Sequence, residues 1–274
     1  MQKAKANGVE LEFETKGSGE PVLLITCGPI ADAFWPFMCE RALVERHRLI
    51  RYHRRGMVGS TRTAPPVSFA EHAADAAALL RHLGVSRAHV VGHSTGANIA
   101  LQLAAQHPDM VHTLALLEPP LMSVPSAAAF FEKAGPSLAA YAAGDHGGAM
   151  ASFLSMVGTL DWDECQSLLD RHVPGGLAQA VEDADNFFGS ELPALTTWQF
   201  DTEQAAAVAQ PVLSVLGTET ERLFVEGDEL LHSWFRQVED CTVEGVGHLL
   251  QMQRPEPVAR GVAEFFARHP MTES

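Results

Sequence analysis

The feature that most constrains the fold of this chain is one serine held between two glycines, where a buried strand is predicted to meet a helix. Residues 87–107 read RAHVVGHSTGANIALQLAAQH. The apolar run before Gly92 is typical of a strand buried on both faces, and the helical pattern after Ser94 ends before Pro108. Gly92 and Gly96 flank Ser94, where the strand and helix backbones crowd together and a Cβ atom would clash. The segment therefore predicts a sharp strand–turn–helix unit that presents the serine hydroxyl.

Strands and helices alternate on both sides of this unit. Earlier in the chain, PVLLIT and HRLIRYH are predicted strands, and a helix begins at Ser68, whose spacing to Glu71 is that of a capping box. Later, QPVLSVLG and QVEDCTVEG are predicted strands, and PEPVARGVAEFFARH is predicted to be the last helix. This alternation is typical of a mostly parallel central sheet flanked by helices. The predicted fold class is therefore α/β.

Residues 122–205 interrupt the alternation. They are rich in alanine and glycine, carry helical patterns such as GAMASFLSMVG and DECQSLLDRHV, and contain no clear buried strand. We interpret them as a helical cap inserted between two strands of one sheet, with residues 1–121 and 206–274 forming the core. A chain of 274 residues is long enough for one α/β domain with such an insertion.

Charge and composition narrow the classes of partner. The formal net charge of −15 argues against nucleic acid and anionic membranes, because both recruit basic surfaces. The first residues carry no apolar signal-peptide core, and no apolar run has the length of a membrane span. The 4 cysteines are scattered, which predicts free thiols in a reducing cytoplasm, and neither they nor the 13 histidines show metal-site spacing. We therefore expect a cytoplasmic protein that needs no metal and no other cofactor.

The segment Gly92–Gly96 fits the pattern G-x-S-x-G, and its setting between strand and helix makes Ser94 a candidate nucleophile. The amino terminus of the following helix adds a positive field where an oxyanion would form, and the Thr95 amide is a natural donor to it. A glycine–serine turn without chemistry is one alternative. A phosphate-binding loop is another, but no GK[ST] follows and the glycine spacing differs.

The order of these motifs resembles the α/β-hydrolase fold family over nearly the whole chain. The GHSTG turn, the helical insertion and the late segment GVGHLLQMQRPEPVARGVAEFF follow one another as in that family, and YHRRGMVGSTR resembles its D-x-R-G-x-G-x-S loop, with His53 at the usual Asp position. The resemblance implies a serine nucleophile, a late catalytic histidine and a helical cap. His248, just past a predicted strand, stands where the family has that histidine, and an imidazole has the pKa that a general base needs.

The same resemblance places the second oxyanion donor. Family members usually carry His-Gly-X after the third strand, and the amide of X donates; this chain has LLITCGPIADAFW. Counting back from Trp35 at the spacing common in the family places Thr26 at the His position, Cys27 at Gly and Gly28 at X. Pro29 has no N–H, so a register one residue later would leave no donor, which supports Gly28.

The acid that would orient His248 has two candidate positions. In the commonest family arrangement it lies three residues after a glycine that ends the penultimate strand; here that glycine is Gly217, and the position holds Thr220. In members similar to haloalkane dehalogenases and zearalenone lactonases, the acid follows the strand after the nucleophile, and Glu118 ends that strand in TLALLEPP. A carboxylate there is costly to bury without a partner such as an imidazole N–H. We therefore favour Glu118 and keep Glu219, beside the empty position, as the alternative.

Together these residues predict a serine hydrolase that cleaves a carboxylic ester or lactone through an acyl-enzyme intermediate. Five aromatic side chains are expected to line a pocket for a small hydrophobic substrate: Trp35, Trp162, Phe187, Phe188 and Trp198. Three alternatives stay open. A cofactor-free perhydrolase of the haloperoxidase type and a carbon–carbon bond hydrolase use the same groups, whereas a ligand receptor or signalling module on the same fold would account for the empty acid position.

Overall fold

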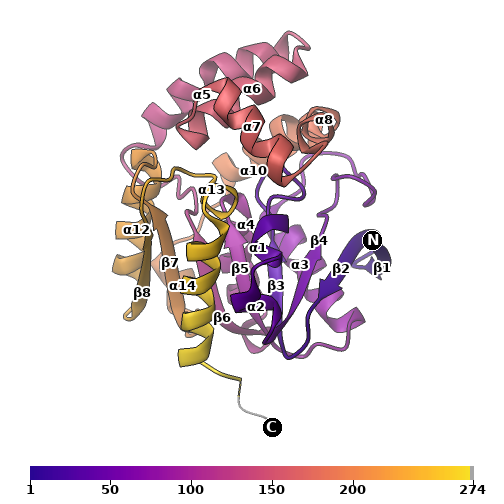
Figure 1. Cartoon of the computed structure of the whole chain (residues 1–274), viewed down its shortest axis with the longest axis vertical. Coiled ribbons are helices and arrows are strands. Elements are labelled where there is room, and N and C mark those ends of the chain that lie inside the picture. Colours follow the sequence, from indigo (N-terminus) through magenta and orange to yellow (C-terminus); the bar gives the residue numbers. More distant parts are fainter. Residues whose placement is uncertain (272–274) are drawn as a thin grey trace.

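The computed structural model describes residues 1–271 and contains an eight-stranded sheet with the order β1-β2-β4-β3-β5-β6-β7-β8 (Figure 1). β1 and β4 each pair antiparallel with β2, and all pairings from β4 to β8 are parallel. The strands are β1 (Gln2–Ala6), β2 (Val9–Lys16), β3 (Glu20–Ile25), β4 (His47–Tyr52), β5 (Ala88–His93), β6 (Val111–Leu117), β7 (Val212–Gly217) and β8 (Val238–Val243). The predicted α/β fold with a mostly parallel sheet is confirmed.

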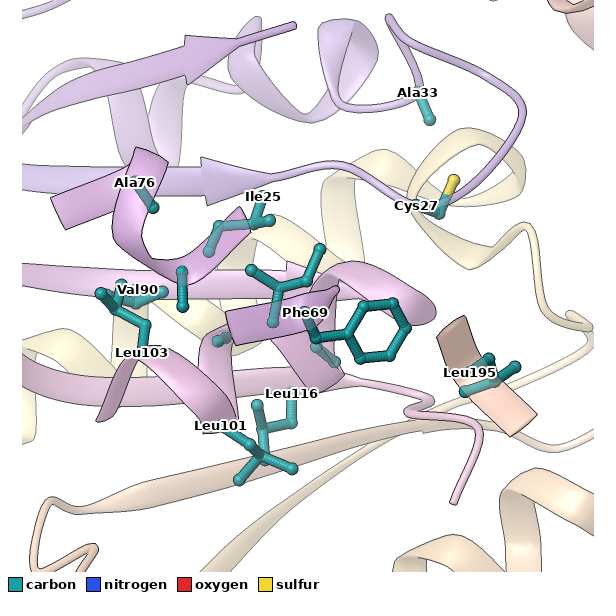
Figure 2. Packing of buried hydrophobic residues seen from close by; sticks show 14 of the residues in the cluster. Ile25, Cys27, Ala33, Phe69, Ala76, Val90, Leu101, Leu103, Leu116 and Leu195 are labelled. Atoms are coloured by element: carbon teal, nitrogen blue, oxygen red, sulfur yellow. The ribbon is translucent and has the colours of Figure 1, made fainter. Parts of the chain in front are cut away.

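Helices cover both faces of this sheet, so its central strands carry buried, mostly apolar side chains on both faces. Neighbouring strand residues alternate between two clusters: Leu23 packs in the first and Leu24 in the second. The helices of the first face are α3 (Phe69–His82), α4 (Thr95–Gln106) and α12 (Arg222–Trp234), and those of the second are α1 (Trp35–Met38), α2 (Arg41–Val44), α13 (Leu250–Gln253) and α14 (Pro255–Arg268). Figure 2 shows the first cluster, in which Phe69 of α3 packs among aliphatic side chains of strands and of α4. Within residues 1–271, no helix is both long and apolar enough to cross a membrane.

The chain between β6 and β7 is helical and contains no strand. Its helices are α5 (Ala127–Ala142), α6 (His146–Gly158), α7 (Trp162–His172), α8 (Gly176–Glu182), α9 (Ala184–Asn186), a π-helical turn (Phe187–Glu191), α10 (Leu192–Thr197) and α11 (Thr202–Ala206). Figure 1 shows α5 to α8 stacked over one end of the sheet. Side chains of α6 and of the π-helical turn line the same cavity as Ser94, so this segment covers that residue. The division of the chain into a core and a cap of residues 122–205 stays a prediction.

Candidate active site

Ser94 occupies the turn between β5 and α4 in a strained backbone conformation, with φ 54° and ψ −130°. Its amide donates to the carbonyl of Leu117 at the end of β6, at 2.9 Å. The flanking glycines make the turn possible. A Cβ atom on Gly92 would lie 2.4 Å from the Gly96 carbonyl oxygen, and one on Gly96 would lie 2.2 Å from the Ile25 carbonyl oxygen. A larger residue at Gly92 would push β5 away from α4, and one at Gly96 would push α4 away from the end of β3, so either would displace the serine.

His248 lies on the loop after β8, and its ring contacts three other side chains. Its Nδ1 donates to Glu118 Oε2 at 2.7 Å. The Phe224 ring stacks on the imidazole, with the centroids 3.9 Å apart and the planes 10° from parallel. The ring of His93 lies with its centroid 4.6 Å away and its plane tilted by 38°, and His93 Nε2 donates to the His248 carbonyl oxygen at 2.8 Å. Because Nδ1 is directed at Glu118, Nε2 is the imidazole nitrogen left for proton transfer.

Glu118 follows β6 at a positive φ of 48°, and its carboxylate is almost fully buried. The Gly217 amide donates to Oε1 at 2.8 Å, and the Thr220 hydroxyl donates to Oε2 at 2.9 Å. Thr220 stands where the commonest family arrangement has its acid, so the residue at that position supports the carboxylate instead of supplying it. Glu219, the alternative acid, is exposed, and its backbone bonds to Val246. The structure brings Glu118 to His248.

Burial governs the protonation of the Glu118–His248 pair. It raises the pKa of the Glu118 carboxyl to about 7, a rise that the hydrogen bonds from Gly217 and Thr220 partly offset. It also lowers the pKa of the His248 imidazole. Because Glu118 and His248 share a hydrogen bond, their protonation is coupled. The first proton that the pair takes up removes the free lone pair on Nε2, whether it binds to His248 or to Glu118. If Glu118 takes it, the new O–H donates to Nδ1 and the proton of the imidazole moves to Nε2.

Ser94 and His248 both line one small apolar cavity of about 40 Å³. The other lining side chains are mostly aromatic and aliphatic, among them Phe130, Phe153, Phe187, Phe224, Leu154, Leu192, Leu195 and Leu249. Gly28 and Thr95, the two expected oxyanion donors, line the same cavity. The space suffices for a few water molecules. An ester must therefore displace lining side chains as it enters.

The Phe187 ring lies against Gly28. A Cβ atom placed on Gly28 would be 2.3 Å from Phe187 Cε2. A side chain at position 28 would therefore collide with the Phe187 ring. The neighbouring residue Cys27 also lines the cavity, but burial raises the pKa of its thiol to about 12. Since the thiolate is the nucleophilic form of cysteine, Cys27 does not compete with Ser94.

The structure brings one of the five aromatic residues expected in the pocket, Phe187, to the cavity. Trp35 is 38% exposed and stacks under the charged groups of Lys16 and Arg51. Phe188 and Trp162 pack within the helical segment, Phe188 by stacking on Tyr141 and Trp162 at the start of α7. Trp198 lies between this segment and α4, where its indole N–H donates to Gln102. Phe130, Phe153 and Phe224 line the cavity but are not among the five expected residues. Phe130 and Phe153 belong to helical patterns in the segment 122–205, but their direction depends on how those helices pack.

His53, at the family's Asp position, lies away from the cavity. Its Nδ1 is 3.0 Å from Glu12 Oε2, and its Nε2 is 2.9 Å from Asp32 Oδ1, so it joins β2 to the loop after β3. Among the described residues, one group places three metal-ligating atoms within 4.8 Å of one another, namely Asp228, His232 and Asp240. This group lies on α12 and β8 and contributes nothing to the cavity.

Comparison with known proteins agrees with this architecture. A family model described as the alpha/beta hydrolase fold matches residues 20–255. A relative from Azorhizobium caulinodans, named as a proposed carbamate hydrolase (RutD), is 36% identical over 117 residues, which are 43% of this chain and 44% of the relative. The match therefore spans less than half the length of that curated relative.

Two solved structures share the fold at low sequence identity. A thermophilic esterase from Thermogutta terrifontis superposes with a TM-score of 0.81 at 22% identity, over 98% of this chain and 100% of that chain. The enol-lactonase from Burkholderia xenovorans superposes with a TM-score of 0.74 at 20% identity, over 97% of this chain and 100% of that chain.

Proposed function

The chain belongs to the α/β-hydrolase fold family, and we propose that within this family it is a serine hydrolase that cleaves a carboxylic ester or lactone through an acyl-enzyme intermediate. One observation carries the proposal: the imidazole that shares a cavity with Ser94 donates from Nδ1 to the buried carboxylate of Glu118, at 2.7 Å. A serine, a histidine and a carboxylate in this order are the groups that nucleophilic acyl transfer needs.

In the proposed mechanism, Ser94 Oγ attacks the substrate carbonyl while His248 Nε2 takes the hydroxyl proton. Glu118 stabilises the imidazolium that forms and holds the tautomer with the proton on Nδ1. The amides of Gly28 and Thr95 donate to the tetrahedral oxyanion. His248 then protonates the leaving alcohol as the intermediate collapses to an ester of Ser94. Water, activated by the same imidazole, releases the acid and restores the serine.

The lining of the cavity favours a neutral, hydrophobic acyl group. Among the described residues that line it, none is lysine or arginine, and the side chains around Ser94 are mainly phenylalanine and leucine. A carbon–carbon bond hydrolase acting on dienone acids would have to bury the substrate carboxylate against this apolar wall, which is costly without a cationic partner. The apolar wall therefore supports an ester or lactone over such an acid.

The experiment that tests this function is a panel of p-nitrophenyl esters of increasing acyl length, aryl lactones and an aryl carbamate. The carbamate is included because the Azorhizobium caulinodans relative is named for that activity. Ser94→Ala protein serves as the blank. Hydrolysis of esters or lactones above the blank is expected. Turnover of the carbamate alone, or equal rates in the blank, would contradict the proposal.

Removing the Thr220 hydroxyl is expected to move the acid limb of the pH profile. Thr220→Val deletes a hydrogen bond that lowers the pKa of Glu118, so this pKa rises above its value of about 7. Because the first protonation of the pair removes the free Nε2 lone pair, activity is then lost at a higher pH as the pH falls. The measurement is kcat/KM against pH. Thr218→Val, in the same loop and bonded to Gly245, is the control, and an unmoved limb in Thr220→Val would refute the coupling.

Enlarging the cavity is expected to change substrate preference. Phe153→Ala removes an aromatic wall, so rates on bulky acyl esters should rise relative to acetate by about 10-fold or more, given the 1–3 kcal/mol that one methylene contributes in an apolar pocket. Phe131→Ala is the matched control, because Phe131 lies in the same helical segment but outside the cavity lining. The measurement is the ratio of kcat/KM for p-nitrophenyl octanoate and acetate. An equal change in both variants would remove Phe153 from the substrate site.

A further inference from the structure

Arg54 and Glu191 form a buried ion pair that the proposed mechanism does not use. Arg54 Nη2 lies 2.7 Å from Glu191 Oε2, although the two residues are 137 positions apart. Their side chains are 0% and 2% exposed. Two other guanidinium nitrogens, Nε and Nη1, are buried without a hydrogen-bond partner among the described residues. A buried pair with unsatisfied donors is a poor source of stability, because desolvation offsets the attraction between the charges.

Each member of the pair also holds one of the two expected oxyanion donors. Glu191 Oε1 accepts a hydrogen bond from the hydroxyl of Thr95, whose amide is one donor. Arg54 Nη2 donates to the carbonyl oxygen of Cys27 at 3.3 Å. That carbonyl belongs to the same peptide unit as the N–H of Gly28, the second donor. The Arg54–Glu191 ion pair is therefore hydrogen-bonded to both segments that carry the expected oxyanion donors.

We propose that Arg54 and Glu191 are positioning residues that hold the oxyanion hole in its working geometry, an inference that rests on the proposed function. An oxyanion hole accelerates acyl transfer when its donors are already oriented before charge develops. The bond from Arg54 fixes the plane of the Cys27–Gly28 peptide and polarises it, which makes the N–H a stronger donor. The bond from Thr95 to Glu191 fixes the first residue of α4 on the other side.

The arrangement also joins the hole to the helical segment above it. Glu191 ends the π-helical turn that begins with Phe187, and the Phe187 ring lies against Gly28. π-Helical turns interrupt a regular helix and are frequent at functional sites. Here the turn delivers an apolar ring and a carboxylate to opposite parts of the same site. The residues that orient the donors therefore come from both the sheet loops and the segment between β6 and β7.

The deciding variant is Thr95→Val, because removing one member of a buried ion pair can unfold the protein. Thr95→Val has nearly the same volume, keeps the backbone amide and loses the hydroxyl that bonds to Glu191. We expect kcat on a p-nitrophenyl ester to fall about 10-fold with KM changed by less than about 2-fold, since loss of a whole oxyanion donor costs about 10²–10³-fold. Thr95→Ser, which restores the hydroxyl, should recover most of the activity. Glu191→Gln keeps the shape of the side chain and loses its charge, and its kcat should be lowered at least as much as that of Thr95→Val.

The affinity of a trifluoromethyl ketone inhibitor distinguishes a positioning role from a purely structural one. Its adduct with Ser94 places a full oxyanion in the oxyanion hole, so its binding depends on the orientation of the two donors. Its affinity should fall in each variant by the same factor as kcat/KM. Arg62→Gln is the control: Arg62 pairs with Asp183, and so ties the same loop to the same helical segment without touching a donor. It should keep the activity of the unchanged protein.

The outcomes separate this inference from the proposed function. If the unchanged protein hydrolyses esters and Thr95→Val keeps both its kcat and its inhibitor affinity, the positioning role is refuted and the serine mechanism stands. If kcat falls as much in Arg62→Gln as in Glu191→Gln, the Arg54–Glu191 pair acts only by holding the helical segment against the loop, and the inference is again refuted. If the unchanged protein hydrolyses no ester or lactone, the proposed function fails and this inference falls with it.

Discussion

Ser94→Ala is expected to lower kcat for ester hydrolysis by roughly 10⁵-fold or more while the protein keeps its fold, the scale seen when the nucleophile of a serine triad is removed. The substitution deletes one hydroxyl oxygen of a residue that lines the cavity. It leaves the turn between Gly92 and Gly96 intact, since the backbone bonds of Ser94 run through its amide and carbonyl. Initial rates on the panel of esters measure the loss of kcat, and a circular dichroism melt measures whether the fold is kept.

Chemical labelling gives an independent measurement of the same residue. A serine-directed organophosphonate should add one mass equivalent to the unchanged protein, on the peptide that contains Ser94, and none to Ser94→Ala. Ser214→Ala is the control, because Ser214 is also buried but lies on β7 outside the cavity lining. A label on any other residue, or label retained in Ser94→Ala, would remove Ser94 as the nucleophile.

The fold could be predicted from the sequence because its signals are local. The capping box of Ser68 and Glu71 marks the start of α3, and buried strands such as β3 contain short continuous apolar runs. The sequence reasoning did not identify β1, which reads QKAKA. This strand lies at the edge of the sheet, where alternating lysine and alanine protect against further pairing and leave little apolar pattern to detect.

The details of the site depend on contacts between residues far apart in the chain. Glu118 could be singled out because the resemblance to family members whose acid follows the strand after the nucleophile points to it, and because a carboxylate at the end of an apolar strand needs a partner. Nothing local marks Thr220 as the donor to that carboxylate, since a threonine in a polar loop has no distinguishing pattern. The same limit applies to Glu191, which meets Arg54 only after the helices between β6 and β7 have packed on the sheet.

The cavity walls illustrate a second limit of sequence patterns. Phe187 and Phe188 are neighbours in one aromatic stretch, yet the first lines the cavity and the second stacks on Tyr141. At 3.6 residues per turn, neighbouring side chains of a helix point about 100° apart, so a sequence that places both residues in one helical stretch does not tell which of them faces the cavity. Phe224 comes from α12, where its spacing is that of an ordinary core residue.

Glu118→Gln is expected to lower kcat by about 10²–10⁴-fold, the range for replacing the acid of a triad. Glutamine keeps the shape of the side chain, but it carries no charge to stabilise the imidazolium. Its amide can also donate to Nδ1, which favours the tautomer with the proton on Nε2 and removes the base. Glu219→Gln is the matched control and should change kcat by no more than a few-fold, because an exposed carboxylate contributes little. Steady-state kinetics on one p-nitrophenyl ester compares the two variants directly.

A double variant shows whether the position of the charge or the identity of the residue matters. In Glu118→Gln, adding Thr220→Asp puts a carboxylate where the commonest family arrangement has its acid. The Thr220 hydroxyl lies 2.9 Å from Glu118 Oε2, the oxygen that accepts from His248, so the new carboxylate starts close to the same imidazole. Part of the lost activity should return, because stabilising the imidazolium requires a nearby negative charge rather than a particular strand. If Glu118→Gln stays within a few-fold of the unchanged protein while Glu219→Gln is crippled, the acid lies in the loop after β7 and the assignment of Glu118 is wrong.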